Sequence, residues 1–189
     1  MDLKNPWPEH WVPISPPADF LSRPDWAPFR VAAPRAYADA PRSIHSPEGR
    51  GDRMRAAAFA ELQAMFAFAW AAERFAAEVT PELSETWAAL AREEEKHLKW
   101  ILTRMHELGV TYDERLVTDA LWTTLMDCKT AQTFGAAIAG AEERGRKAGV
   151  RFHESLLTTD PVTADIFGRI AAEEIEHIQR NSAVEGESK

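Results

Sequence analysis

Residues 93–97 read Glu-Glu-Glu-Lys-His, and residues 173–177 read Glu-Glu-Ile-Glu-His. Each stretch contains a Glu-x-x-His pair: Glu94 with His97, and Glu174 with His177. On a helix, residues three apart project from one face about one turn apart, so the carboxylate and the imidazole can bind one metal ion. A single pair arises easily in a glutamate-rich helix. Two pairs at equivalent positions indicate a metal site built from two helices.

The two stretches belong to an internal repeat with an offset of 80 residues and no gap. Thr80-Pro81 matches Asp160-Pro161, and each is a good N-cap residue followed by a proline at the first helical position. Glu94 follows Thr80 by 14 residues, and Glu174 follows Asp160 by the same number. Two equivalent helices are therefore expected to present Glu and His at the same depth in the fold.

Around these motifs the chain has helical patterning and no credible strand. The predicted long helices cover residues 53–77, 81–108, 130–157 and 161–180, and Gly109 ends the second. Short links make each successive pair an antiparallel hairpin, and a long connection at 109–129, with a short helix near 118–127, joins the hairpins. The sequence therefore predicts an all-α, ferritin-like four-helix bundle: two αα-hairpins with a long crossover, over residues 51–181.

Residues 1–50 differ from the rest. Ten of the 12 prolines lie in residues 1–47, a stretch that has no glycine. Proline at that density disfavours helix and regular sheet. The aromatic residues there are Trp7, Trp11, Phe20, Trp26, Phe29 and Tyr37. We expect a Pro-rich extended arm wrapped on the bundle, with the aromatics as anchors; a partly disordered tail is the alternative. Residues 182–189 form a C-terminal tail.

A di-metal carboxylate site also needs one glutamate from each of the other two helices. In the first helix, Glu61 shares a face with Met54, Met65 and Phe68. In the third, Glu142 shares a face with Ile138 and is preferred to Glu143. The predicted metal ligands are Glu61, Glu94, His97, Glu142, Glu174 and His177. Glu93 and Glu173 also match in the repeat, and we expect them to flank or support the ligands.

Charge supports a metal site over the alternative that these are surface glutamates. Residues 56–189 hold 14 basic and 23 acidic residues, a balance of −9, whereas residues 1–55 are close to neutral at +1. Four unpaired carboxylates inside an apolar bundle would each cost several kcal/mol. Two divalent cations would offset them. Carboxylate oxygens with one imidazole per metal suit two Fe ions or Mn, with Zn as an alternative.

Composition excludes several other classes. The single cysteine, Cys128, rules out a disulfide framework and any cysteine-based zinc or iron–sulfur site. No apolar run approaches the roughly 20 residues of a membrane span. The first residues, Met-Asp-Leu-Lys-Asn-Pro, lack an apolar signal-peptide core, so we expect a cytoplasmic protein with no membrane partner. The acidity disfavours a nucleic-acid surface.

The six ligand residues resemble the ligand set of the ferritin-like di-iron carboxylate superfamily. Within it, the chain resembles a bacterial family of unassigned function related to the methylthio-isopentenyl-adenosine tRNA hydroxylase. The resemblance covers roughly residues 50–180, and its matching segments are 60–64, 93–97, 121–122, 142–145 and 173–177. It implies a non-haem di-iron centre that activates O₂ to hydroxylate or oxidise an organic substrate.

The expected function is therefore an O₂-activating oxygenase or hydroxylase, with Glu94 and Glu174 bridging two metals. Its partners would be a small-molecule or modified-nucleoside substrate, O₂ and an external electron donor; tRNA is less favoured. Two alternatives remain. One is a metal-handling or peroxidase-type ferritin-like protein, and the other is a non-catalytic scaffold in which metal ions only stabilise the bundle. A monomer or dimer is expected. No catalytic residue is assigned beyond the metal centre.

Overall fold

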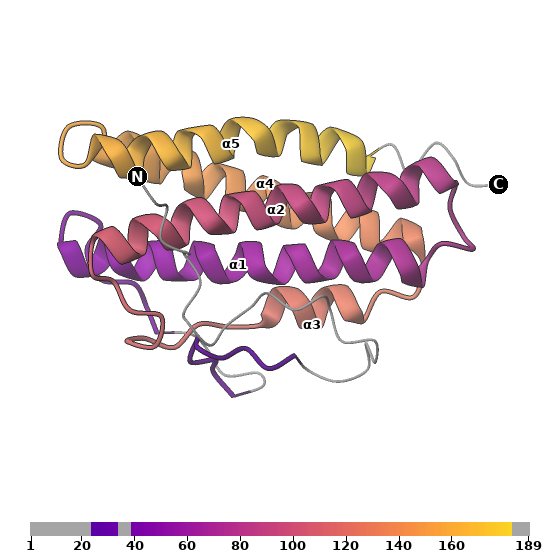
Figure 1. Ribbon diagram of the computed structural model, residues 1–189, viewed down its shortest axis with the longest axis horizontal. Helices are drawn as coiled ribbons and strands as arrows, with labels where there is room; N and C mark the ends of the chain where they lie inside the picture. The colour runs from indigo at the N-terminus through magenta and orange to yellow at the C-terminus, as the bar shows by residue number, and fades with distance from the viewer. Residues whose placement is uncertain (1–23, 34–38, 183–189) are drawn as a thin grey trace.

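The computed structural model describes residues 24–33 and 39–182, and within these residues the chain forms five helices and no strand (Figure 1). The long helices are α1 (Pro47–Arg74), α2 (Pro81–Glu107), α4 (Ala131–Leu156) and α5 (Pro161–Ser182), and the short one is α3 (Ala120–Met126). The prediction of an all-α bundle is confirmed.

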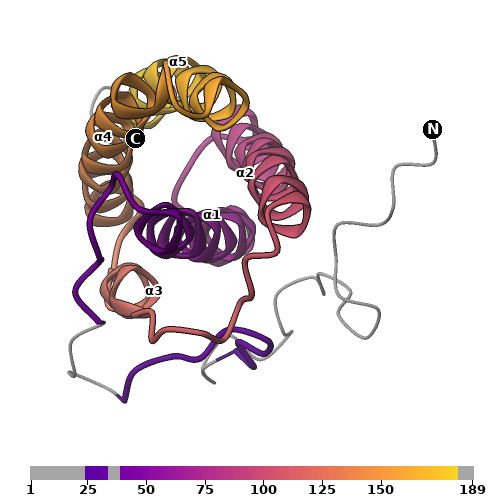
Figure 2. The ribbon, with the colours of Figure 1, turned by 90° about the vertical axis from the view of Figure 1, so that its left-hand side faces the viewer.

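The long helices form two hairpins, α1 with α2 and α4 with α5 (Figure 1). Seen end-on, the four stand around a common centre, and α3 lies outside them next to α1 (Figure 2). The connection between α2 and α4 carries α3 along the outside of the bundle. This crossover brings the second hairpin against the first, so that all four long helices can share one interior.

The helix ends follow from their capping residues. Ser46 and Thr80 each accept a hydrogen bond from the backbone N–H three residues on, and each precedes a proline. Gly109 ends α2 with a positive φ of 68°, which glycine adopts at little cost. The predicted start of the first helix at residue 53 was wrong, because the Ser46-Pro47 cap begins α1 at Pro47.

Part of the Pro-rich arm packs on this scaffold. Trp26 and Phe29 are buried, and the Trp26 indole donates a hydrogen bond of 3.3 Å to Asp119. Val31 pairs with Val117 in an isolated bridge, so residues 24–33 lie along the connection between α2 and α3. The other predicted anchors (Trp7, Trp11, Phe20 and Tyr37) and the tail at 183–189 lie outside the described residues.

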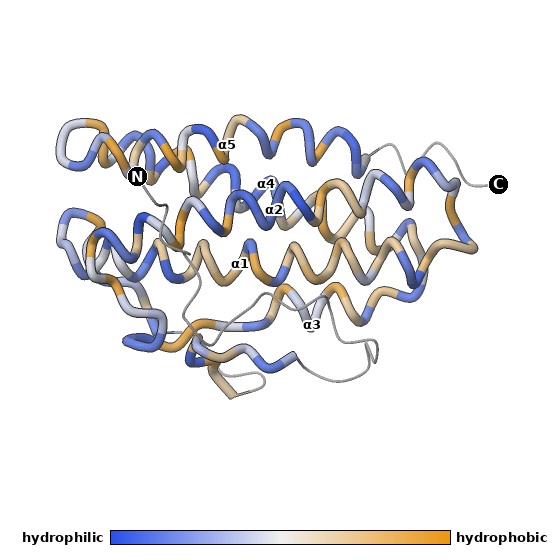
Figure 3. Tube along the Cα trace, viewed as in Figure 1, coloured by the Kyte–Doolittle hydropathy of each residue, from blue (hydrophilic) through white to orange (hydrophobic). Residues whose placement is uncertain are grey.

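The hydropathy of the helices is uneven (Figure 3). Much of α1 is apolar, whereas the middle of α2 is hydrophilic. That hydrophilic stretch contains Glu94 and His97, whose side chains are nevertheless buried in the bundle. None of the helices in the described part of the chain has the length and hydropathy needed to cross a membrane. The polar interior halfway along the bundle therefore requires a separate explanation.

Candidate metal centre

The structure brings all six predicted ligand residues together at the centre of the bundle. They are Glu61 on α1, Glu94 and His97 on α2, Glu142 on α4, and Glu174 and His177 on α5. Their ligand atoms form two groups, each within 4.8 Å: Glu61, Glu94, His97 and Glu174, and Glu94, Glu142, Glu174 and His177. Glu94 and Glu174 belong to both groups, so the cluster consists of two adjoining sites that share two carboxylates.

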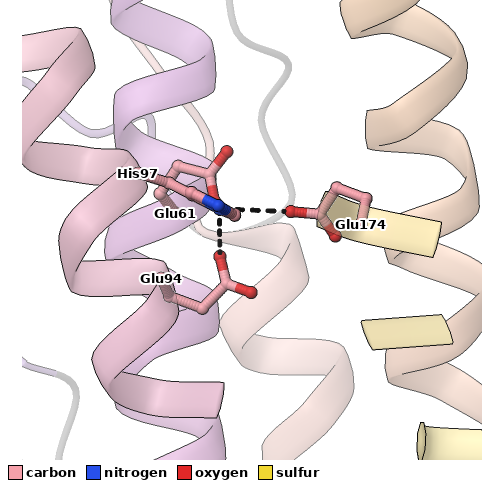
Figure 4. A group of neighbouring side chains, drawn as sticks. All are labelled: Glu61, Glu94, His97 and Glu174. Atoms are coloured by element: carbon pink, nitrogen blue, oxygen red, sulfur yellow. Dashed lines mark ion pairs between the residues drawn. The ribbon is translucent and has the colours of Figure 1, made fainter. Parts of the chain in front are cut away.

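The Nδ1 atoms of the two histidines face the carboxylates. His97 Nδ1 lies 3.4 Å from Glu174 Oε1 and 3.8 Å from the nearest oxygens of Glu61 and Glu94 (Figure 4). His177 Nδ1 lies 2.9 Å from Glu94 Oε1 and 3.5 Å from Glu174 Oε2. The two rings stack 5.5 Å apart at 21°. The 80-residue repeat of the sequence is thus a near-symmetry of the site.

Several buried polar atoms of this cluster have no hydrogen-bond partner within the described residues. These atoms are Oε1 of Glu94, both carboxylate oxygens of Glu142, and Nδ1 of His97 and His177. Even the 2.9 Å approach of His177 Nδ1 to Glu94 lacks hydrogen-bond geometry. An unsatisfied buried polar atom costs about 1–3 kcal/mol, so five of them require compensation. Carboxylate oxygens and imidazole nitrogens that converge in this way are a donor set that fits divalent cations.

The opposite ring nitrogens are held by glutamates from the facing helix. His177 Nε2 lies 2.9 Å from Glu93 Oε2, and His97 Nε2 lies 2.8 Å from Glu173 Oε2. Arg180 Nη1 in turn donates a hydrogen bond of 2.9 Å to Glu93 Oε1. On the other side, Lys96 Nζ lies 2.6 Å from Glu173 Oε2. Because a carboxylate only accepts, each Nε2 is the donor and each Nδ1 is free to bind a metal.

The protonation of the metal-free cluster reflects its burial. Burial raises the pKa of Glu61 well above its ordinary value, and the neighbouring Glu94 carboxylate raises it further. Burial likewise raises the pKa of Glu142. Burial opposes the charged form of His177, but attraction to the adjacent Glu174 and Glu94 carboxylates outweighs it and raises its pKa to about 11. Without cations, this cluster can be neutralised only by holding protons.

Two other titratable residues of α4, Glu143 and His153, lie outside the cluster. Glu143 is partly exposed and pairs with Arg146 at 2.7 Å, so Glu142 is the α4 glutamate that enters the site. His153 lies away from it, with its Nδ1 2.7 Å from the carbonyl oxygen of Ala164. The sequence predicts that Glu93 and Glu173 support the ligands, but it does not show that each reaches the histidine of the other helix. The signal for these contacts in the sequence is that Glu93 and Glu173 occupy equivalent positions in the 80-residue repeat.

A cavity of about 590 Å³ leads to the cluster between α1, α4 and α5. Its inner surface includes the carboxylates of Glu61, Glu94, Glu142 and Glu174. Most of its walls are apolar, among them Ala57, Ala60, Ile138, Ala141, Phe152 and Ile170. Gly145 also lines it, and a Cβ atom there would meet nothing within 4 Å. The predicted ligands therefore border a space large enough for a small organic molecule.

Comparison with known proteins identifies one family. A family model described as "Protein of unknown function (DUF455)" matches residues 10–182 of the chain. No curated protein and no solved structure matches the chain. The family description carries no activity, so the chemistry has to be inferred from the buried cluster and the cavity beside it.

Proposed function

The chain belongs to the family of unknown function DUF455, and we propose that it is a non-haem di-metal oxidoreductase that activates O₂ to hydroxylate or oxidise a small organic molecule. One observation carries the proposal: two four-residue ligand groups, sharing Glu94 and Glu174, lie buried beside an apolar cavity. The resemblance of the six residues to the ferritin-like di-iron ligand set supports the same chemistry.

The ligands divide evenly between two cations. Glu61 and His97 would bind one, Glu142 and His177 the other, and the two shared glutamates would lie between them. Two divalent cations supply four positive charges, which match the four carboxylates. Carboxylates with one imidazole per metal favour iron or manganese, and zinc would also accept these ligands. When bound, a redox-active pair supplies the electron transfer to O₂ that protein side chains lack.

The chain itself positions the reacting groups. Glu93 and Glu173 fix the histidine rings and their tautomers, so that Nδ1 of each ring faces the metal position. The apolar cavity walls hold the substrate and exclude water next to Glu61 and Glu142. In hydroxylation, one oxygen atom of O₂ enters a substrate C–H bond and the other leaves as water. Two electrons and two protons balance this reaction, and an external reductase would supply the electrons.

The first test is O₂ consumption by protein loaded anaerobically with Fe(II). We expect about two iron ions per chain and rapid O₂ uptake, both lost in Glu94→Ala and His177→Ala. Glu143→Ala is the matched control, because Glu143 neighbours Glu142 in sequence but lies outside the cluster. Less than one metal per chain, unchanged by Glu94→Ala, would exclude a di-metal site.

A metal-handling or peroxidase-type role is the second candidate, because the same ligands could bind iron without oxidising an organic substrate. It predicts iron far in excess of two ions per chain, or turnover of peroxide without a substrate. The apolar cavity beside the ligands favours the oxygenase, since iron storage and peroxide turnover do not need an apolar space of about 590 Å³. Product formation coupled to O₂ uptake distinguishes the two.

A further inference from the structure

The cavity that reaches the metal centre has arginines at one end. Arg53 on α1 and Arg151 on α4 both line it. The two helices run in opposite directions (Figure 1), so Arg53, eight residues before Glu61, and Arg151, nine residues after Glu142, lie toward the same end. At about 1.5 Å per residue, each is about 12–14 Å along its helix from its ligand glutamate.

In the described part of the chain, no carboxylate neutralises either of these two arginines. Arg53 Nη1 donates hydrogen bonds of 2.8 Å to the carbonyl oxygens of Arg42 and Gly49, which fix the guanidinium without neutralising it. Within residues 24–33 and 39–182, neither Arg53 nor Arg151 forms an ion pair with a carboxylate. Arg146, the third arginine of the lining, is different, because Glu143 binds it through two hydrogen bonds of 2.7 and 3.0 Å.

Two guanidinium groups that have no carboxylate partner among the described residues stand out in a chain with a net charge of −8. They stand at one end of an apolar cavity whose other functional surface consists of carboxylates. An anion would be repelled by those carboxylates unless cations offset them, whereas the arginine end attracts it. Apolar walls between the two ends favour a hydrocarbon body.

We infer that the cavity binds an organic anion with an apolar body, whose charged group contacts Arg53 and Arg151 and whose apolar part extends toward Glu61 and Glu142. This assigns the substrate class of the proposed oxidoreductase and rests on that function for the reaction, but not for binding. The arginine end acts as an anchor, and the part of the substrate about 12–14 Å from the anion reaches the metal centre.

Binding can be measured directly by calorimetry with decanoate and decyl phosphate, using the full chain with and without metal. The neutral decanol and the cationic decyltrimethylammonium are the matched probes. We expect one of the two anions to bind at least tenfold more tightly than decanol, and the tighter of them identifies the charged group. Equal binding of decanol, or tighter binding of the cation, would overturn the inference.

Charge variants locate the anion. Arg53→Gln should weaken anion binding about tenfold, because one charged hydrogen bond is lost, and Arg151→Gln should weaken it less, because Arg151 is exposed. Arg144→Gln, on the same helix but outside the cavity lining, should have no effect. If neither Arg53→Gln nor Arg151→Gln weakens binding, the anion is held elsewhere, for instance on the metal ions, and the inference is wrong.

Glycine variants locate the apolar body. Gly145→Leu fills the cavity where a Cβ meets no atom within 4 Å, so it should abolish binding without unfolding the chain. Gly140→Leu, on the same helix but outside the lining, should bind normally, with thermal unfolding as the check on both.

Anion binding without O₂ uptake would refute only the proposed oxidation, whereas O₂ uptake without anion binding would refute only this inference.

Discussion

Glu93 on α2 holds His177 on α5, with Glu93 Oε2 2.9 Å from the Nε2 atom of the imidazole. The reverse pair, Glu173 with His97, has the same geometry at 2.8 Å. Each Glu-Glu-x-x-His stretch therefore supplies two ligands to the cluster and a support for the histidine of the other helix. The two halves of the internal repeat orient each other, which ties the geometry of the site to the packing of α2 against α5.

This pairing predicts that Glu93→Gln weakens metal binding although Glu93 touches no metal position. Loss of the carboxylate that orients His177 should reduce the affinity for the metal by about tenfold to a hundredfold. Competition with a chelator of known affinity measures it. Glu95→Gln is the matched control, because Glu95 pairs with Lys99 at 2.7 Å away from the site. Equal affinities of the two variants would contradict the supporting role of Glu93.

A second prediction separates the metal site from fold stability. Glu142 is buried with both carboxylate oxygens unpaired, so Glu142→Leu should stabilise the metal-free protein, by about 1–3 kcal/mol. The same change should remove most of the stabilisation that added metal gives the wild type. Denaturant unfolding in the presence and absence of EDTA measures both. If Glu142→Leu destabilises the metal-free protein as much as the metal-loaded one, Glu142 is a structural residue.

Two glycines make a matched pair for stability. Gly145 lies within α4, where a Cβ meets open space, so Gly145→Ala should stabilise the protein by about 0.5–1 kcal/mol through helix propensity. At Gly49 a Cβ would lie 1.8 Å from the carbonyl oxygen of Ser43, so Gly49→Ala should destabilise it. Thermal unfolding of both variants checks this. A stabilising Gly49→Ala would show that the turn before α1 is packed differently.

Acid stability should depend on Asp52 at the start of α1. Hydrogen bonds from Arg42 hold the pKa of Asp52 at about 2, below its ordinary 3.8. A carboxyl with a lowered pKa stabilises the fold fully above its unfolded-state pKa and loses this effect as the pH falls through the folded value. Asp52→Asn should therefore cost about 1–3 kcal/mol at pH 7.

The lowered pKa of Asp52 also sets the pH range in which that cost changes. Unfolding measured from pH 5 downwards should show the difference between Asp52→Asn and the wild type shrinking as the pH falls from about 4 toward 2. A difference that stays constant over this range would mean that the pair with Arg42 does not contribute through charge.

Much of the fold and the site could be predicted from the sequence because their signals are local. Thr80-Pro81 and Gly109 bracket α2, and the spacing of Glu94 and His97 places both on one helix face. The helix face shared with Ile138 also favours Glu142 over Glu143, and the structure places Glu142 in the cluster and Glu143 outside it.

Other features depend on how the helices approach one another. The reach of Glu93 to His177 depends on the separation of α2 and α5, which no spacing within one helix determines. The arginine end of the cavity likewise depends on how far α1 lies from α4. The early start of α1 has a local cause. The prolines up to Pro47 indicate an extended arm, although Pro47 itself is the first residue of the helix.

A crystal structure of the iron-loaded protein, with anomalous differences recorded at the iron absorption edge, tests the di-metal centre most directly. We expect two peaks inside the bundle, one beside His97 Nδ1 and one beside His177 Nδ1, with Glu94 and Glu174 between them. No peak in this cluster, or iron found only at surface carboxylates, would contradict the di-metal centre and the chemistry inferred from it.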